Sequence, residues 1–221
     1  MAGTTVNEEN LVYKTVRTAI NERGYDFTLE EVLMEGAGKE KLQAIRSVLA
    51  IRDVHDDRLA QEIFARFQLL LDEAYAVMPI SAQPNATEVF HELRERGVKV
   101  VMNTGYDRRT AVALVAKIGW KAGVDYDGLV TASDVGKNRP YPDMILQAMQ
   151  QHDINDACTV LKVGDSIIDI EEGRNAGCRY SIGITTGAHT FAQLSSASPD
   201  FILDDLIDLL PLVDKANAIS R

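Results

Sequence analysis

Cysteine is scarce in this chain of 221 residues, which holds only Cys158 and Cys178. Neither belongs to a Cys-x-x-Cys arrangement. Each lies beside an apolar run that we expect to form a strand, where a buried thiol behaves as a small hydrophobe. A reducing, cytoplasmic environment is the corresponding expectation.

The chain also lacks long apolar runs and an excess of positive charge. No apolar stretch approaches the roughly 18 residues of a membrane span, and residues 1–10 lack the basic and apolar regions of a secretory leader. Lys and Arg number 23 against 33 Asp and Glu, a formal charge of -10, which argues against a nucleic-acid or anionic-membrane surface. We therefore expect a soluble, unexported protein in which an anionic substrate needs local cations.

The spacing of apolar residues divides the chain into a helical segment and an α/β segment. From residue 8 to about 78 they recur at three- and four-residue steps, as in amphipathic helices, and no strand interrupts them. Pro79 and Pro84 then punctuate the chain, and from residue 85 helices and strands alternate as in a parallel sheet. We expect a core domain of residues 1–7 and 79–221 and an inserted helical cap domain of residues 8–78.

Within these domains the pattern predicts the following elements. Strands are expected at residues 98–102, 128–131, 158–163, 180–184 and 201–203. Helices are expected at residues 40–50, 108–118, 143–151, 170–176 and 206–216. In the cap, residues 34–39 form a glycine-bearing loop between two short helices.

Two carboxylates stand four residues apart where an apolar run ends. Asp165 follows the strand expected at 158–163, and Asp169 falls at the start of the next helix. Open α/β sheets bind ligands in the crevice beyond the carboxyl ends of their parallel strands, and clustered carboxylate oxygens there suit Mg²⁺. Helix capping is the other interpretation of both acids, because acidic residues favour the first turn of a helix.

Two further places offer groups that bind phosphate. The strand expected at 98–102 runs into Thr104, Gly105 and Tyr106, where a hydroxyl and backbone N–H groups at a strand-to-helix turn can hold phosphoryl oxygens. Arg139 lies between turn residues ahead of a helix, and a guanidinium can clamp a phosphate with two hydrogen bonds. Capping or solvation explains each residue singly, but their order along the chain favours a functional set.

This set resembles the haloacid dehalogenase superfamily of hydrolases, and in detail its phosphonatase branch, over nearly the whole chain. Residues 104–106 match the Thr-Gly-Tyr of that branch, and residues 139–140 match its Arg-Pro. Residues 164–169 match the superfamily's final motif, Gly-Asp-(Ser/Thr)-x-x-Asp. The resemblance implies an α/β fold with a Rossmann-like core, a parallel sheet and an inserted α-helical cap domain.

The resemblance also implies roles for these residues. Asp165 binds Mg²⁺, and Asp169 binds or orients the ion as part of the catalytic set. Thr104 and Arg139 grip the phosphoryl oxygens during catalysis. The neighbours of Thr104 that contact substrate are Gly105 and Tyr106.

The opening of the chain departs from the family. The nucleophile motif of the phosphonatase branch reads Asp-x-Ala-Gly-Thr, and this chain opens Met1-Ala2-Gly3-Thr4-Thr5, so Met1 falls one place after the nucleophilic aspartate. By the resemblance, the Ala2 carbonyl binds Mg²⁺ and Thr4 contacts substrate. The nucleophile is therefore expected to be missing from the sequence as it stands.

The strand that carries this nucleophile in the family lies in the middle of the sheet and pairs on both sides. Without it, each backbone group left unpaired in a buried layer costs on the order of 1–3 kcal/mol. Our hypothesis is that the chain starts at an internal methionine and that the natural protein extends roughly ten residues upstream. As it stands, the chain is then nearly inert, since loss of a covalent nucleophile costs on the order of a million-fold in another hydrolase.

Two features concern the kind of bond that is broken. Ala2 stands where typical phosphatases of the family keep a second aspartate that protonates the leaving alcohol. An alkoxide needs that proton and an enamine carbon does not, so the alanine fits cleavage of a carbon–phosphorus bond. Gly36 and Lys39 match the Gly-x-x-Lys of the branch's cap loop, whose lysine forms a Schiff base with an aldehyde substrate.

The cap loop also departs from the branch, because Leu42 replaces a histidine and Glu35 replaces a methionine. Three roles for Lys39 stay open: a catalytic Schiff base, a plain substrate contact in the loop that Gly36 begins, or a solvated surface lysine.

The sequence thus predicts a Mg²⁺-dependent hydrolase that acts on a small phosphorylated metabolite through an aspartyl-phosphate. One alternative is a phosphonoacetaldehyde hydrolase with Lys39 as its Schiff base. An alternative of another class is a truncated, non-catalytic paralogue that binds metabolites or a protein partner through the same pocket. We expect no nucleic-acid or membrane partner, and a possible homodimer, because helical caps in this branch can mediate dimers.

Overall fold

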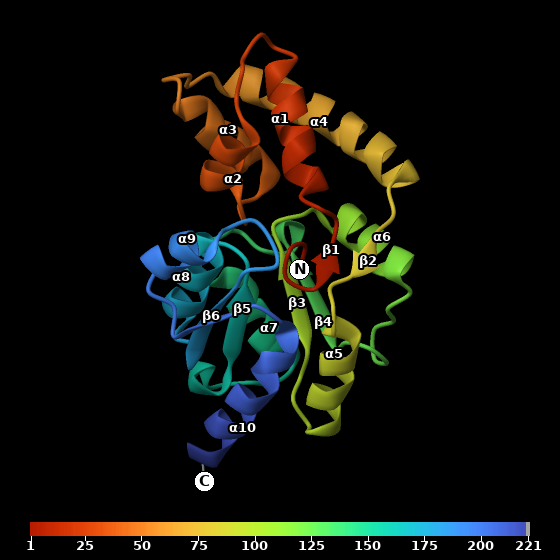
Figure 1. The fold of residues 1–221 in the computed structure, drawn as a ribbon, viewed down its shortest axis with the longest axis vertical. Helices are drawn as coiled ribbons and strands as arrows, with labels where there is room; N and C mark the ends of the chain where they lie inside the picture. The colour runs from red at the N-terminus through yellow and green to blue at the C-terminus, as the bar shows by residue number, and fades with distance from the viewer. Residues whose placement is uncertain (220–221) are drawn as a thin grey trace.

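The computed structural model describes residues 1–219 and arranges them as a helical segment above an α/β body (Figure 1). The helical segment, or cap, holds α1 (Leu11–Asn21), α2 (Leu29–Gly36), α3 (Lys41–Ala50) and α4 (Asp57–Val77), and the cap loop is residues 37–40 between α2 and α3. The α/β body is the core. Its two connections to the body lie side by side, because β1 (Val6–Asn7) pairs antiparallel with β2 (Ser81–Ala82).

Local sequence explains where these helices begin and which side they bury. The buried residues of α1 include Val12 and Val16, which recur at helical spacing, and the helix packs on α4. Thr28 begins α2 with a capping box: its hydroxyl accepts the N–H of Glu31, whose carboxylate accepts the N–H of Thr28. The carboxylate of Glu40 accepts two N–H groups in the first turn of α3.

The body alternates helices and strands along the chain, as predicted for an α/β core. Its strands after β2 are β3 (Val101–Thr104), β4 (Gly128–Thr131), β5 (Leu161–Gly164), β6 (Tyr180–Ile184) and β7 (Phe201–Leu203). Its helices are α5 (Ala86–Glu95), α6 (Arg108–Ile118), α7 (Asp143–Gln151), α8 (Ile167–Ala176), α9 (Phe191–Ser196) and α10 (Leu209–Ile219). Short 3-10 turns lie at Ala132–Asp134, Ala157–Thr159 and Leu206–Asp208.

The parallel strands form two sheets. In one, β3 pairs with β4; in the other, β6 lies between β5 and β7, and every pairing is parallel. Within residues 1–219 no strand bridges the facing edges of β3 and β5. Figure 1 shows α5 and α10 in front of these two strands and α7 behind them. The α/β class is confirmed, but the single sheet that we predicted is divided.

The strand predicted at 158–163 is shorter than expected. Ala157–Thr159 is a 3-10 turn, because the carboxylate of Asp156 accepts the N–H of Cys158 at 2.8 Å, and β5 starts only at Leu161. Cys158 is exposed, so the prediction of a buried thiol at this position was wrong.

The ends of other helices and strands also differ from those predicted. The strand predicted at 98–102 forms at 101–104 and so includes Thr104. The helix predicted from residue 170 begins at Ile167, which places Asp169 inside its first turn. Gly36, predicted in a loop, ends α2, and the helix predicted from residue 206 opens with a 3-10 turn. Among the described residues, no helix is long and apolar enough to cross a membrane.

Candidate active site

Asp165 lies at the carboxyl end of β5, in a close-fitting cradle of backbone. Its carboxylate accepts the Thr4 hydroxyl at 2.9 Å and the N–H of Ala188 at 2.8 Å. A Cβ atom added to Gly3 would lie 2.2 Å from this carboxylate, and one added to Gly187 would lie 2.1 Å from it. Only glycines therefore allow the first residues of the chain and the segment after β6 to close around Asp165.

Asp169 lies one turn into α8 and differs electrostatically from Asp165. Burial raises the pKa of Asp165, and the nearby negative charge of Asp169 raises it further. Burial also acts to raise the pKa of Asp169, but the positive charges of Arg139 and Lys162 outweigh it and hold that pKa below its usual range. Two carboxylates therefore share one buried corner, and only Asp169 has cations directly against it.

A buried ionic network occupies the space between β3, β5 and α8. Lys162 lies 2.7 Å from Asp169 and 3.3 Å from Glu172, and Arg139 lies 3.3 Å and 2.8 Å from the same carboxylates. The side-chain oxygen of Asn103 accepts from Arg139 at 2.7 Å and from Lys162 at 3.0 Å. Two cations and two anions balance one another here, which offsets part of the cost of burying them.

Arg139 reaches the cap loop as well, because its guanidinium donates to the carbonyl of Gly38 at 3.0 Å. The predicted phosphate clamp is thus held by the network and by the cap at the same time. Sequence reasoning missed Lys162 and Glu172. A signal was present, since a lysine inside the apolar run of β5 and a fully buried glutamate on α8 both require charged partners.

The loop after β3 brings three predicted substrate residues against the cap. The Thr104 side chain is buried, and its hydroxyl accepts the N–H of Tyr106 at 3.3 Å. A Cβ atom on Gly105 would lie 2.6 Å from the carbonyl oxygen of Lys39. Glycine at this position therefore lets the cap loop pack directly on the core loop.

Gly36, the last residue of α2, and Lys39, in the loop after it, both contact α3. The Lys39 ammonium donates to the Ser47 hydroxyl at 3.0 Å and lies 4.0 Å from the Glu35 carboxylate. Burial lowers its pKa. Gly36 packs near the Cβ atom of Ala44, where an added Cβ would be at 3.4 Å.

Lys41 is a second lysine in the cap loop region, and sequence reasoning missed it. Its ammonium donates to the Lys39 carbonyl at 2.6 Å and lies 5.3 Å and 5.2 Å from the ring centroids of Tyr13 and Tyr106. Burial lowers the pKa of Lys41 to about 8. Its position on the buried side of α3, three and four residues before Ala44 and Ile45, was the available signal.

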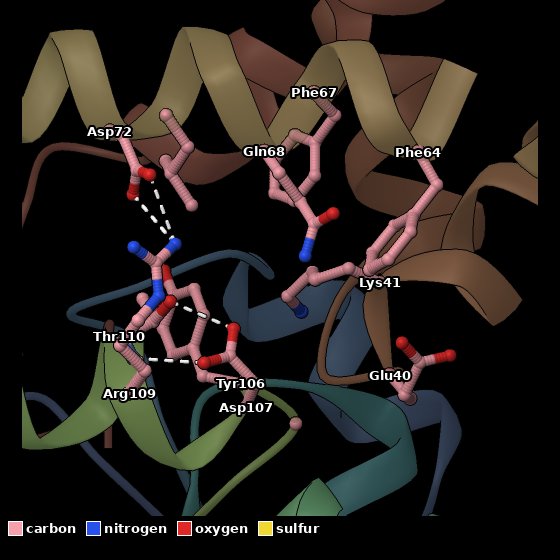
Figure 2. A pocket seen from close by; sticks show the side chains of 12 residues that line it. Glu40, Lys41, Phe64, Phe67, Gln68, Asp72, Tyr106, Asp107, Arg109 and Thr110 are labelled. Atoms are coloured by element: carbon pink, nitrogen blue, oxygen red, sulfur yellow. Dashed lines mark hydrogen bonds and ion pairs between the residues drawn. The ribbon is translucent and has the colours of Figure 1, made fainter. Parts of the chain in front are cut away.

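A buried carboxylate beside Lys41 joins the cap to the core. Glu8 accepts hydrogen bonds from the hydroxyls of Tyr75 and Tyr106, the latter at 2.9 Å. Burial raises the pKa of Glu8 to about 7. Figure 2 shows Lys41 and Tyr106 in the adjoining pocket, which lies between α4 and the loop after β3. The pocket has a volume of about 30 Å³, which is room for a water molecule.

His189 makes another link between cap and core. It is buried, its Nδ1 accepts the N–H of Ile167 at 3.0 Å, and its Nε2 lies 3.1 Å from the carbonyl of Leu33 in α2. These bonds place the proton on Nε2. Sequence reasoning gave this histidine no role, because its partners are backbone groups far away in the chain.

The residues present fit a divalent cation at Asp165 better than at Asp169. Both oxygens of Asp165 accept hydrogen bonds from neutral groups, and no side-chain cation pairs with them among the described residues. A bound cation would therefore offset the burial and the repulsion from Asp169 that raise the pKa of Asp165. Both oxygens of Asp169 are engaged, one by Lys162 at 2.7 Å and one by the Ser166 hydroxyl at 2.5 Å. Among the described residues, no group of three or more His, Cys, Asp or Glu side chains is arranged to hold a metal ion.

Known proteins place the chain in a family. A family model for haloacid dehalogenase-like hydrolases matches residues 1–177. The phosphonoacetaldehyde hydrolase of Bacillus cereus (strain G9842) is 32% identical over 201 residues, which cover 85% of this chain and 74% of that protein. A bifunctional phosphonoacetaldehyde hydrolase/aminoethylphosphonate transaminase of Clostridioides difficile (strain 630) is also 32% identical, over 97% of this chain and 35% of that protein.

The fold agrees with solved structures. A phosphonoacetaldehyde hydrolase-like protein from Oleispira antarctica superposes with a TM-score of 0.84 at 23% identity, covering 98% of this chain and 90% of that one. The chain therefore belongs to the haloacid dehalogenase-like hydrolases, and within them to a phosphonatase-like group.

Proposed function

We propose that this site hydrolyses a small phosphorylated metabolite with Mg²⁺, through an aspartyl-phosphate. Family membership makes the chain a hydrolase of phosphate esters or phosphonates. The observation that carries the finer proposal is a convergence of charge at the ends of β3 and β5. Lys162 and Arg139 lie 2.7 Å and 3.3 Å from Asp169. Thr4, three residues after Met1, donates to Asp165 at 2.9 Å.

Each group in this convergence has a part in the proposal. The Thr104 hydroxyl and the cations would hold the phosphoryl oxygens. Asp165, with the carbonyl of Ala2, would hold Mg²⁺, and the ion would neutralise charge on the phosphoryl group. Asp169 would position the ammonium of Lys162, with which it is already paired. Closure of the cap loop over Gly105 would exclude water.

The nucleophile is the part that the described residues do not supply. An aspartate placed one residue before Met1 would enter the same charged corner, because the Met1 amino group already donates to the carbonyl of Asn103 at 3.3 Å. Its carboxylate oxygen would bond to phosphorus as the bond to the leaving group breaks, and water would then release phosphate.

Activity of two forms tests this proposal. One is the chain as it stands, and the other carries an apolar strand ending in Asp before Met1. Each is assayed with Mg²⁺ against a panel of phosphate esters and phosphonates. We expect hydrolysis by the extended form alone, lost when its last added residue is Asn. Inactivity of the extended form across the panel would instead favour a non-catalytic, metabolite-binding paralogue.

Cleavage of phosphonoacetaldehyde is a second candidate function, favoured by the relatives and by two lysines at the cap loop. Either Lys39 or Lys41 would form an imine with the aldehyde, with loss of water, and borohydride would reduce it to a stable amine. Mass spectrometry of Lys39→Arg and Lys41→Arg identifies the lysine that reacts. No adduct on either lysine in the unsubstituted chain would remove this candidate.

A further inference from the structure

The two connections between the cap and the core come together at one buried side chain, Glu8. This residue follows β1, where the chain leaves the core, and Tyr75 lies near the end of α4, shortly before the chain returns to it. Tyr106 belongs to the core loop after β3. The hydroxyls of both tyrosines donate to the same carboxylate oxygen of Glu8, and their two oxygens are 2.9 Å apart. Glu8 therefore ties both ends of the cap to the core loop.

A buried glutamate is a costly way to make such a tie. Glu8 is only 4% exposed, and glutamate is almost never buried so completely without a partner of opposite charge. The cation that acts on it is Lys41, whose charge lowers the pKa of Glu8, but burial has the larger effect and raises that pKa to about 7. Ionisable groups held in such surroundings are frequent at functional sites.

The Lys41 ammonium lies between two tyrosine rings and beside the core loop. Its Nζ is 5.3 Å from the ring centroid of Tyr13 and 5.2 Å from that of Tyr106, within the range of cation–π attraction. It donates to the Lys39 carbonyl at 2.6 Å. A Cβ atom on Gly105 would lie 2.6 Å from that same carbonyl oxygen. The amino group is therefore next to the loop that follows β3.

Lys41 also has hydrogen-bonding capacity left, whereas Lys39 is engaged elsewhere. An ammonium has three N–H donors. Among the described residues, the Lys39 carbonyl is the one acceptor of Lys41, whose side chain is nevertheless buried. The Lys39 ammonium instead donates to Ser47 and lies 4.0 Å from Glu35. Of the two lysines, Lys41 is the one that adjoins the core loop with donors to spare.

Both rings that flank Lys41 are anchored by their hydroxyls. The Tyr13 hydroxyl accepts the N–H of Gly38 at 2.9 Å, which fixes that ring to the cap loop. The Tyr106 hydroxyl donates to Glu8 at 2.9 Å. A tyrosine ring that is bonded at its hydroxyl and held by the backbone at its other end keeps one orientation. Glu8 thus decides where the Tyr106 face lies, and with it one wall around Lys41.

We propose that Glu8 is a positioning residue for the Lys41 amino group: it anchors the Tyr106 ring, and that ring holds the amino group beside the core loop. Because Tyr75 belongs to the cap and Tyr106 to the core, Glu8 does this only while the cap is closed on the core. The positioning rests on these contacts alone. Its use on a substrate rests on the proposed function, in which the same core loop binds the phosphoryl group.

NMR signals of the Lys41 side chain test this proposal on the chain as it stands. The chain is labelled with ¹³C-lysine, and the Lys41 signals are identified by their loss in Lys41→Arg. Protons above the face of an aromatic ring resonate upfield, so the Hε protons of Lys41 should lie upfield of those of lysines that contact no ring. Glu8→Ala should remove most of this shift. Glu8→Gln should keep it, because the amide oxygen still accepts from both tyrosines.

Two further variants make the result decisive. Glu9→Ala is the matched control, since Glu9 is the exposed neighbour of Glu8 and should leave the Lys41 shift unchanged. Tyr106→Phe keeps the ring and removes its bond to Glu8, so it should lose part of the shift and gives the answer if Glu8→Ala does not fold. An unchanged Lys41 shift in Glu8→Ala or Tyr106→Phe overturns the proposal. An equal loss in Glu9→Ala overturns it as well.

Kinetics of the extended form separate this inference from the proposed function. In that form Glu8→Ala should lower kcat on the order of a hundred-fold, since a misplacement of about 1 Å can have that effect, and Glu8→Gln should restore most of it. A Lys41 shift that depends on Glu8, with an inactive extended form, keeps the positioning and removes the hydrolysis. Hydrolysis that is insensitive to Glu8→Ala keeps the proposed function and removes this inference.

Discussion

Single residues decide how closely the cap and the core approach each other. Gly105 allows the Lys39 carbonyl to lie where a side chain would otherwise be, and Glu8 holds two tyrosines from different parts of the chain. Both contacts are buried, so small changes there have measurable costs. The charged surface pairs of the molecule carry much less free energy.

Gly105→Ala should lower the free energy of unfolding by about 1–3 kcal/mol, because the new methyl group would meet backbone at 2.6 Å. Gly136→Ala is the matched control, since an added Cβ there meets nothing within 4 Å. Urea denaturation of both variants measures the difference. Equal stability of the two would show that the cap loop moves aside at little cost.

Glu8 should make stability depend on pH. Its folded pKa of about 7 lies above the ordinary value of 4.5, so the folded state holds this proton more tightly. Stability from this group is complete below pH 4.5 and is lost as pH rises through 7. The groups around it are Lys41, Tyr75 and Tyr106, whose hydrogen bonds and charge only partly offset burial.

Glu8→Gln keeps the shape and removes the titration. Between pH 4.5 and pH 8 the unsubstituted chain should lose on the order of 3 kcal/mol more unfolding free energy than the variant does. Urea denaturation at several pH values measures this. Parallel pH profiles of the two proteins would mean that Glu8 titrates normally.

At the scale of elements, α8 is tied to β5 and to the loop before α7 by charge. Lys162 of β5 and Arg139 share the carboxylates of Asp169 and Glu172, and all four side chains are buried. Removing one member of such a network leaves an opposite charge buried with fewer partners. The position of α8, and with it Asp169, therefore depends on this network.

Lys162→Met should destabilise the chain by about 3–5 kcal/mol, because the carboxylates of α8 would keep only Arg139. Lys99→Met is the control: Lys99 is exposed, lies 3.3 Å from Asp127, and should change stability by less than about 1 kcal/mol. Thermal unfolding of both variants measures how much stability each one loses. Similar losses in the two variants would contradict a special role for the network.

Helices and strands with a regular spacing of apolar residues were predicted well from the sequence. Side chains whose contacts come from distant parts of the chain were predicted poorly. The helix 108–118 and the strand 180–184 lie where apolar spacing placed them. The strand expected from residue 158 begins only at Leu161, because the carboxylate of Asp156 accepts the N–H of Cys158 and a 3-10 turn forms first. Lys41 and His189 were missed, since the two tyrosine rings around Lys41 and the backbone partners of His189 lie far away in the chain.

At the scale of the whole molecule, two sheets, a helical segment and one charged corner are arranged around Met1. The facing edges of β3 and β5 border a single groove, and the corner lies at its polar end. Family membership was predictable because its motifs are short and local, at residues 104–106, 139–140 and 164–169. The sequence patterns predicted one parallel sheet, and its division between β3–β4 and β5–β6–β7 was not predicted.

The proposed binding of Mg²⁺ would depend on the whole assembled corner, because Asp165 and the cradle around it come from three parts of the chain. Mg²⁺ at about a hundred times its dissociation constant should stabilise the fold by about 2.7 kcal/mol. For a chain of this size, that raises the melting temperature by roughly 5–10 °C. EDTA should reverse the shift, and Asp165→Asn should abolish it, whereas Asp208→Asn, at an exposed position, should retain it. A shift that survives in Asp165→Asn would place the ion elsewhere and would leave the buried carboxylate of Asp165 without its proposed partner.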